Sequence, residues 1–250
     1  MEAIRFTTKE LSKKTWPDYE RFFQRNGRGS CGCMLYPRGR PLSAPRGTSL
    51  DDPCHGGKQL PSRDLRGAQS LSELRDLVER DRAHGILVYG GGEVVGWCQY
   101  GRVEDLPVAP SQRTPAWMLA ADPTSNWRIT CFITLLEFRR RGVATLALAV
   151  AVQSIRQRGG GWIEARPVVH CHYDPELGKA RRTYGPKSRE VAEHLELWPV
   201  QNVPRVGWVR AAEAGGRTAP HRGTMSMFER LGFTVAGRDG ETGVLMRLHV

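Results

Sequence analysis

The sequence predicts one domain of the α/β or α+β class, and three observations support this. The chain has 250 residues, 40% hydrophobic and 25% charged, which is an ordinary globular composition and enough for a self-sufficient core. Short runs rich in β-branched and aromatic residues, bounded by glycines, predict strands. Segments with helical signals lie among strands that mostly follow one another along the chain. We therefore expect a single domain over 1–250.

The first half of the chain carries a hairpin signal and a helix-start signal. Gly90-Gly91-Gly92 separates two apolar runs and predicts a β-hairpin turn. Ser70 and Glu73 form the S-x-x-E pattern of a capping box, so a helix should open at Ser70. The stretch 27–67 is rich in Gly and Pro and predicts a long irregular loop. In order, we expect a strand over 4–7, a helix over 16–25, a helix over 70–82, strands over 85–89 and 93–100, and a strand over 127–134.

The second half predicts a long helix, further strands and an insertion. Apolar residues from 143 lead to a Gly159–Gly161 run, which suits a helix end. The expected elements are a helix over 143–158, a strand over 162–168, a short helix over 224–231, a strand from Phe233 and a strand over 243–248. The connection between the strand and the short helix, 169–222, is expected to be an insertion.

The charge of the chain is strongly basic. The 37 Lys and Arg residues against 26 Asp and Glu give a formal net charge of +11. Guanidinium groups bind phosphates well, on a nucleotide or on nucleic acid, but biased codon usage produces the same excess. The longest apolar stretch, 143–152, is too short to span a bilayer, and the N-terminus has no signal pattern. We therefore expect a cytoplasmic protein.

The cysteines predict neither a disulfide framework nor a metal site. Six cysteines in a chain of this length follow no secreted pattern, so reduced thiols are expected. Cys31, Cys33, Cys54 and His55 offer ligand atoms but lack the paired spacing of zinc motifs. We expect no bound metal.

The most informative segment is a strand followed by Arg139-x-x-Gly142-x-Ala144 and a helix. A glycine-bearing turn that opens a helix directs several backbone N–H groups at one point, and the helix dipole adds positive potential there. Gly142 and Ala144 are small where an anion must approach the main chain. The neighbouring arginines strengthen the positive field. This pattern predicts a phosphate or pyrophosphate site.

Two motifs in this order resemble the GNAT acetyltransferase superfamily. The run ITLLEFRRRGVA, 133–144, resembles its strand–loop–helix core, whose pyrophosphate signature is Arg/Gln-x-x-Gly-x-Gly/Ala. The segment MFERLGF, 227–233, resembles its closing motif. Resemblance to a GNAT subgroup is carried by Cys31-Gly-Cys33, Gly96-Trp-Cys98, Thr130-Cys-Phe132 and Arg166-Pro-Val168. The likeness covers most of 1–168 and 223–248.

This resemblance implies a fold and a cofactor. The implied fold is a mixed, mostly antiparallel sheet, splayed between its fourth and fifth strands and flanked by helices, with acyl-CoA, most simply acetyl-CoA, in the cleft. The main chain of Phe132 and Thr134 should bind the pantetheine arm, and the amides of 140–145 should hold the pyrophosphate. Many relatives have Asp-Pro before the loop, where this chain has Leu135-Leu136. The residues so assigned to the cofactor are Phe132, Ile133, Thr134, Arg139, Arg140, Arg141, Gly142, Val143, Ala144, Thr145 and Phe228.

The chemistry that the resemblance implies is direct attack of an amine on a thioester, which needs a base and often an acid. Many relatives use a Tyr as the acid, but that position holds Phe228, which has no proton to donate. The frequent Asn seven residues earlier is His221. The candidate bases are Glu164, His170 and His221, with His172 beside them. Cys131 is expected to be a small buried hydrophobe rather than a nucleophile.

The expected acceptor is the amine of a small molecule, bound between the 27–67 loop and the segment after Val168. Two other functions stay open. One is a non-catalytic CoA-binding module, which the missing Tyr favours.

The other alternative is an aminoacyltransferase that takes its donor from tRNA. Twelve cations against seven acids over 156–222 give +5, and the run 179–187 places cations beside an aromatic residue. The expected RNA-binding residues are Lys179, Arg181, Arg182 and Lys187. The intact Arg139-x-x-Gly142-x-Ala144 pattern favours acyl-CoA over this donor.

Overall fold

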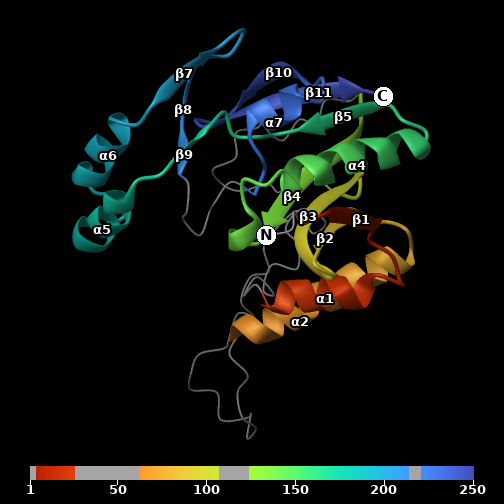
Figure 1. Ribbon diagram of the computed structural model, residues 1–250. Helices are drawn as coiled ribbons and strands as arrows, with labels where there is room; N and C mark the ends of the chain where they lie inside the picture. The colour runs from red at the N-terminus through yellow and green to blue at the C-terminus, as the bar shows by residue number, and fades with distance from the viewer. Residues whose placement is uncertain (1–3, 26–61, 107–123, 214–220) are drawn as a thin grey trace, which may run out of the picture. The chain divides into compact units, whose positions relative to one another are not determined.

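The computed structural model describes residues 4–25, 62–106, 124–213 and 221–250 (Figure 1). They form two compact units, 1–159 and 160–250. Within the described ranges, no helix is long and apolar enough to cross a membrane. The expected α/β class with mostly antiparallel strands and flanking helices is confirmed. The splay between the fourth and fifth strands and the single-domain organisation stay predictions.

The first unit is an antiparallel sheet with helices on both faces (Figure 1). Its elements are β1 (Phe6–Glu10), α1 (Trp16–Arg25), α2 (Ser62–Glu79), β2 (His84–Gly90), β3 (Glu93–Arg102), β4 (Ser125–Thr134), the 3-10 turn η1 (Leu136–Phe138) and α4 (Val143–Gln157). The strand order is β1-β2-β3-β4. Every residue of β2 is buried, because α1 and α2 pack on one face of the sheet and α4 on the other. The expected hairpin and the helices at 16–25 and 143–158 are confirmed.

The helix α1 buries an aromatic face against the sheet. Its residues Trp16, Tyr19 and Phe23 recur at helical spacing and are all at most 5% exposed. The Tyr19 ring meets Trp97 of β3 edge-on, with centroids 4.9 Å apart. This packing holds α1 against β3.

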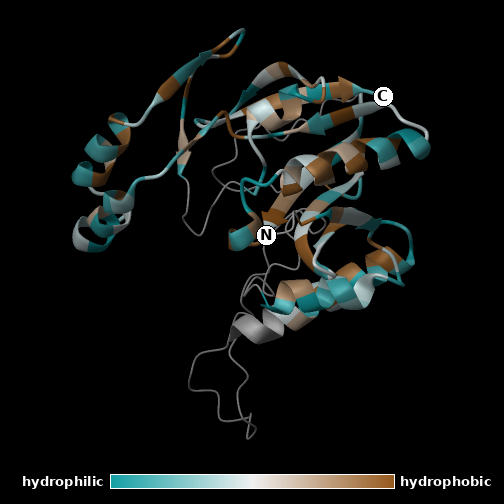
Figure 2. Cartoon of the chain, in the orientation of Figure 1, coloured by the Kyte–Doolittle hydropathy of each residue, from teal (hydrophilic) through white to brown (hydrophobic). Residues whose placement is uncertain are grey.

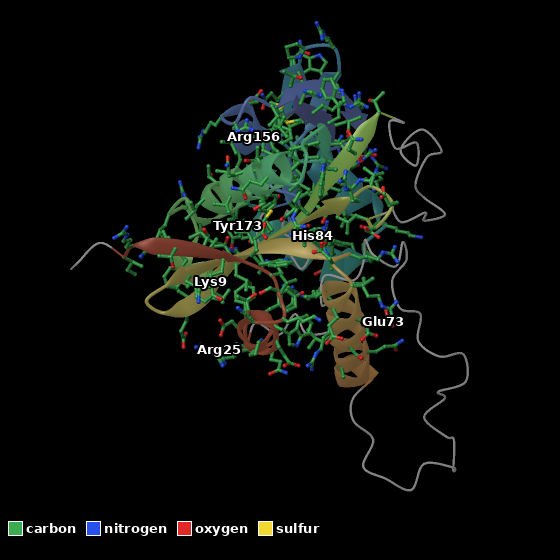
Figure 3. The ribbon with its side chains drawn as sticks, turned by 90° about the vertical axis from the view of Figure 1, so that its right-hand side faces the viewer. Lys9, Arg25, Glu73, His84, Arg156 and Tyr173 are labelled. Carbon is green, nitrogen blue, oxygen red and sulfur yellow. The ribbon has the colours of Figure 1, made fainter. Side chains whose placement is uncertain are left out.

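The second helix begins earlier than the capping-box pattern predicted. α2 starts at Ser62, and Ser70 is a fully buried residue inside it. Glu73 (Figure 3) accepts a hydrogen bond from the Gln69 side chain at 2.9 Å instead of returning to a helix start. An S-x-x-E pattern also fits one helix face at i and i+3, which is why the prediction was wrong. The rest of the expected 27–67 loop falls largely outside the described residues.

The second unit combines an antiparallel sheet with the inserted segment. Its elements are β5 (Trp162–Ala165), β6 (Cys171–His172), α5 (Pro175–Tyr184), α6 (Arg189–Glu196), β7 (Val200–Val203), β8 (Gly207–Arg210), β9 (Ala212–Glu213), α7 (Met225–Glu229), β10 (Thr234–Asp239) and β11 (Gly243–His249). The sheet order is β5-β11-β10. In the insertion, α5 and α6 share a small core around Leu177, Val191 and Trp198. The insertion therefore has structure of its own.

Candidate functional site

The glycine turn after β4 opens α4 as expected. Gly142 is the N-cap of α4 with φ of 82° and ψ of −1°, a left-handed conformation that favours glycine. Arg140 also has a positive φ, 61°. Backbone N–H groups in such alternating conformations converge and form anion-binding concavities. Figure 2 shows the hydrophobic residues of α4 giving way to hydrophilic ones toward its C-terminal end.

The start of α4 presents donors that the helix itself does not use. The first four N–H groups of any α-helix lack an intrahelical acceptor. In α4 these include the N–H groups of Val143, Ala144 and Thr145. The N-cap residue, Gly142, has no side chain that could accept a hydrogen bond from them. A Cβ added to Gly142 would meet no protein atom within 4 Å, so the space beside the turn is open. An anion can therefore approach these donors.

The three arginines of the turn add positive charge next to this open space. Arg139, Arg140 and Arg141 are all exposed. The Arg141 guanidinium lies 5.8 Å from the centroid of the Phe138 ring. Among the described residues, no ion pair engages any of the three. Their charges are available to a ligand.

Close packing against β3 holds the first residue of α4 in place. Val143 is 2% exposed, and its Cγ1 lies 2.3 Å from where a Cβ on Gly96 would be. No larger residue fits at Gly96 without moving Val143. The glycine thus sets the distance between the sheet and the helix start.

Along β4, the backbone N–H and C=O groups of alternate residues point away from β3. The N–H of Leu135 donates to the Val95 carbonyl at 2.9 Å. In an antiparallel pair, alternate residues exchange hydrogen bonds with the partner strand, so Ile133 also faces β3. The N–H and C=O groups of Phe132 and Thr134 therefore point to the other side of β4. These are the groups that the resemblance to the GNAT superfamily assigned to the pantetheine arm.

The candidate bases all lie in the second unit, in different surroundings. Glu164 on β5 is fully buried, and Arg247 of β11 is opposite it in the ladder. His170 is half-buried, and burial together with the nearby His172 lowers its pKa from 6.5. His221 is partly exposed. A buried carboxyl and a histidine with a lowered pKa are both suited to proton transfer.

A buried carboxylate that sequence reasoning missed ties two of these segments together. Asp239 is 2% exposed and accepts hydrogen bonds from Arg166, at 3.1 Å, and from Arg222. The N–H of Val168 donates to the Gly223 carbonyl at 3.1 Å. The chain before His170 is thereby fixed beside the chain after His221. No local sequence pattern connects these positions.

The closing helix is placed as the motif predicted. α7 covers most of the expected 224–231 helix, and Phe228 is fully buried. Its ring meets Phe233 edge-on, with centroids 5.0 Å apart. Phe228 therefore has a packing role, whatever it contributes to a cofactor.

The expected RNA-binding cations are only partly available. Lys179 lies 3.7 Å from Glu176, and Arg181 donates to Glu213 at 2.7 Å. Arg182 and Lys187 are exposed, and within the described part of the chain neither forms an ion pair. Two of the four cations thus stabilise the insertion itself.

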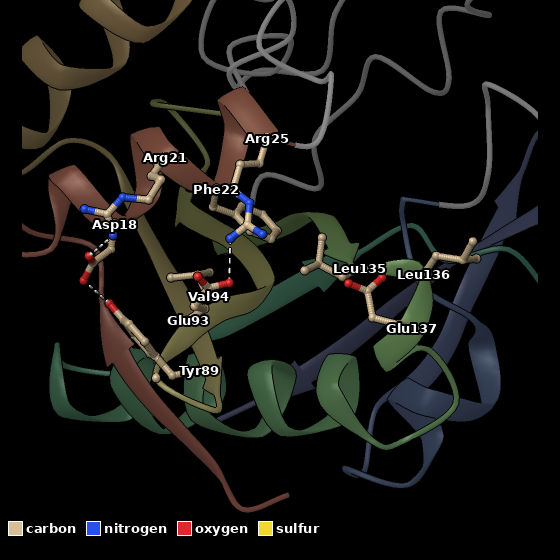
Figure 4. Close-up of a pocket in the computed structure, with 11 residues that line it drawn as sticks. Asp18, Arg21, Phe22, Arg25, Tyr89, Glu93, Val94, Leu135, Leu136 and Glu137 are labelled. Atoms are coloured by element: carbon tan, nitrogen blue, oxygen red, sulfur yellow. Dashed lines mark hydrogen bonds and ion pairs between the residues drawn. The ribbon is translucent and has the colours of Figure 1, made fainter.

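A cavity of about 260 Å³ lies in the first unit, where α1 ends (Figure 4). It is lined by Asp18, Arg21, Phe22, Arg25, Tyr89, Gly92, Glu93, Val94, Leu135, Leu136 and Glu137. Sequence reasoning did not find it, because its walls come from α1, the β2–β3 turn and the end of β4.

The described residues contain no metal-binding group of His, Cys, Asp or Glu. Cys98, Cys131 and Cys171 are free thiols. Cys131 lies in the apolar cluster with Trp97 and Ile133, as expected for a small hydrophobe. Cys31, Cys33, Cys54 and His55 lie outside the described residues.

Residues 52–172 match the model of the acetyltransferase (GNAT) family. No curated protein matches the chain. Three similar solved structures illustrate the relatives. An acetyltransferase from Thermus thermophilus is 12% identical, with all of both chains covered and a TM-score of 0.42. The ribosomal-protein-S5-alanine acetyltransferase from Vibrio fischeri is 11% identical, with 100% of this chain and 95% of that chain covered and a TM-score of 0.43. An aminoglycoside N-acetyltransferase in complex with CoA is 13% identical, with 73% and 86% covered and a TM-score of 0.35.

Proposed function

We propose that this chain, whose residues 52–172 match the acetyltransferase (GNAT) family, transfers an acyl group from acyl-CoA to the nitrogen of a small-molecule amine. The observation that carries the proposal is the start of α4. Uncapped N–H groups, an open glycine and three exposed arginines occur together there. Such a site is complementary to a pyrophosphate.

The residues at this turn fit the diphosphate of CoA. The N–H groups of 143–145 would bind phosphate oxygens, and the arginines of 139–141 would neutralise their charge. The backbone groups of Phe132 and Thr134 that point away from β3 would hold the pantetheine arm as an added strand holds its neighbour, as the family resemblance implies. Ile133 would support them from the β3 side. The assignment of Phe228 to the cofactor stays a prediction.

Acyl-CoA, when bound, supplies an acyl thioester whose thiol leaves readily, because thiols have a pKa of about 8.5. This lessens the need for the acid that Phe228 cannot provide. A neutral amine is the attacking form, so the chain must take up the ammonium proton. Among Glu164, His170 and His221, the lowered pKa of His170 keeps its imidazole neutral at pH 7, which is the form that accepts a proton. We assign the base to His170 first.

The pH dependence of turnover tests this assignment. His170→Gln should lower kcat/KM and abolish the acid limb of its pH profile. His172→Gln should move that limb to higher pH, because it removes a neighbour that lowers the pKa of His170. An unchanged limb in His170→Gln would move the role to Glu164 or His221.

Binding of CoA tests the site directly. Gly142→Glu puts a carboxylate into the open space and should weaken CoA binding by at least about 100-fold in calorimetry, through exclusion and like charge. Ala144→Asp should act in the same direction. Gly159→Glu is the matched control, since Gly159 has a φ of 98° and an equally open Cβ position just after α4. Unchanged CoA affinity in Gly142→Glu would refute the proposal.

The two alternative functions have distinct outcomes. Tight CoA binding without CoA release for any amine would indicate a binding module. An aminoacyl-tRNA donor predicts a gel-shift complex with total tRNA that weakens steeply with salt. Replacing Arg182 and Lys187 together should then reduce the salt dependence. The absence of a complex at low salt would exclude that donor.

A further inference from the structure

The inserted segment of the second unit contains a β-hairpin whose two faces differ. β7 and β8 pair antiparallel and run side by side (Figure 1). On one face, Val203 and Val209 are at most 1% exposed. On the other face, Val200 is 52% exposed and Trp208 is 63% exposed. The buried face holds the hairpin in place, and the outer face, with Val200 and Trp208, is left to solvent.

Trp208 is the largest apolar side chain on this outer face. Val200 is its diagonal neighbour in the ladder, because Trp208 pairs with Asn202, two residues along β7. Diagonal neighbours on one face of a sheet lie within reach of an aromatic side chain. Leu197, shortly before β7, is 84% exposed. Aromatic residues are enriched at the core of protein interfaces, so this composition is typical of an interaction surface.

β7 also has a free edge. The N–H of Ala211 donates to the Pro199 carbonyl at 2.9 Å, so these two residues form a hydrogen-bonded pair at the base of the hairpin. Such pairs alternate in an antiparallel ladder, so the N–H and C=O groups of Val200 and Asn202 point away from β8. In the described part of the chain, β7 and β8 form a sheet of two strands, and no third strand covers this edge. The edge is open to pairing with another extended chain.

The charges of the hairpin favour an acidic partner. Residues 197–210 include Arg205 and Arg210 and contain no Asp or Glu. Arg205 is exposed at the turn, and Arg210 is partly exposed on the outer face. Among the described residues, no ion pair engages either guanidinium group. A second copy of this chain would bring the same two cations to the interface, whereas carboxylates would complement them.

We propose that the free edge of β7 binds an extended acidic segment of another protein, which adds a third strand to the hairpin. Its backbone pairs with Val200 and Asn202, and an apolar side chain packs on Trp208. Its carboxylates meet the two arginines. Added strands gain affinity from main-chain hydrogen bonds and specificity from side-chain contacts. A nucleic acid fits this edge less well, because its phosphates would lie against the outward carbonyl oxygens and its backbone has no N–H group to offer them. The proposal is independent of the proposed function.

Two capped peptides test the proposal by NMR titration of the full chain. Glu-Thr-Val-Thr-Glu places Val and both Glu side chains on the same face of a strand, and Lys-Thr-Val-Thr-Lys is its basic counterpart. We expect the acidic peptide to shift the backbone amide signals of Val200 and Asn202 and the indole N–H signal of Trp208. It should bind at least about tenfold more tightly than the basic peptide.

Two pairs of variants separate the side-chain contact from the backbone contact. Trp208→Ala should weaken binding of the acidic peptide at least about tenfold, as expected for a central aromatic residue. Trp162→Ala is the matched control, because Trp162 on β5 of the same unit is also exposed, at 38%, and should leave binding unchanged. Asn202→Pro removes an outward N–H without removing a hydrogen bond inside the hairpin, so it should weaken binding at least about threefold. Asn202→Ala keeps this N–H and should bind normally.

Several results would overturn the proposal. One is the absence of amide shifts along β7 with the acidic peptide at millimolar concentration. Equal binding of the basic peptide, or unchanged binding in Trp208→Ala, would do the same. An oligouridylate that shifts the Trp208 indole signal where the acidic peptide does not would assign this face to RNA instead. CoA affinity reports separately on the proposed function and should be the same in all four variants.

Discussion

Gly96→Ala should disturb the start of α4 from the neighbouring strand, without touching the proposed ligand site. The new methyl group would lie 2.3 Å from Cγ1 of Val143, where ordinary contacts exceed about 3.4 Å. Val143 is buried and β-branched, so its side chain has one strongly preferred rotamer in a helix and cannot easily turn aside. The first turn of α4 must move by about 1 Å.

The cost follows from overpacking. Extra methylene groups in a packed core usually cost about 1–3 kcal/mol. Replacing glycine by alanine returns about 0.4–1 kcal/mol by restricting the unfolded chain. We expect a net loss of about 1–2 kcal/mol in the free energy of unfolding. Because the donors of 143–145 move with the helix, CoA binding should also weaken by about tenfold.

A double-mutant cycle isolates the contact. Val143→Ala alone removes two methyl groups and should cost about 1–3 kcal/mol. In the double variant, the methyl group added at position 96 partly refills the space that Cγ1 left. The combined loss should therefore be smaller than the sum of the single losses by at least about 1 kcal/mol. CoA affinity should return to within about threefold of the unaltered protein.

Urea unfolding and calorimetry of CoA binding measure both quantities for the four proteins. Additive losses across the cycle would show that Gly96 and Val143 do not compete for space. CoA affinity that is unchanged in Gly96→Ala would show that the position of the helix start does not limit binding. Either result would contradict the reasoning from this contact.

Three further predictions concern charges and backbone strain. Asp239→Ala leaves Arg166 and Arg222 without their shared buried partner and should cost about 2–4 kcal/mol, measured by urea unfolding; a loss below about 1 kcal/mol would contradict a structural role. Burial, with a neighbouring arginine, lowers the pKa of His84 from 6.5, so the unfolded chain protonates first and stability should fall as pH decreases below 6.5. His84→Gln should flatten that part of the stability profile. Arg140→Gly relieves a positive φ and should raise the melting temperature slightly while weakening CoA binding a few-fold.

The part of the site that the sequence predicted is made of contiguous backbone. The role of Gly142 could be predicted because a strand-to-helix turn needs a residue that tolerates a positive φ. The structure confirms this conformation at the N-cap of α4. The alternation that points the backbone N–H and C=O groups of Phe132 and Thr134 away from β3 follows from strand geometry alone. Local chain geometry is therefore enough to predict a main-chain anion site.

The side-chain parts were not predictable in this way. The cavity at the end of α1 combines Phe22 and Arg25 with Glu137, which lies more than a hundred residues later in the sequence. Asp239 meets Arg166 and Arg222 only because segments far apart in the sequence are folded together. The start of α2 was misplaced for a related reason, since a capping pattern fits a helix interior equally well. Each of these depends on tertiary neighbours.

Net charge illustrates the same limit most clearly. The basic insertion suggested an RNA surface, yet Arg181 is bound to Glu213 and Lys179 lies beside Glu176. A charge count over a segment treats every cation as equally available, whereas folding neutralises those that meet carboxylates. The arginines of 139–141 are different, because the turn exposes them beside uncapped helix donors and, in the described chain, no carboxylate neutralises them. The positive charge at the start of α4 is therefore more available to a ligand than the positive charge of the insertion. This difference favours a nucleotide cosubstrate over a polynucleotide.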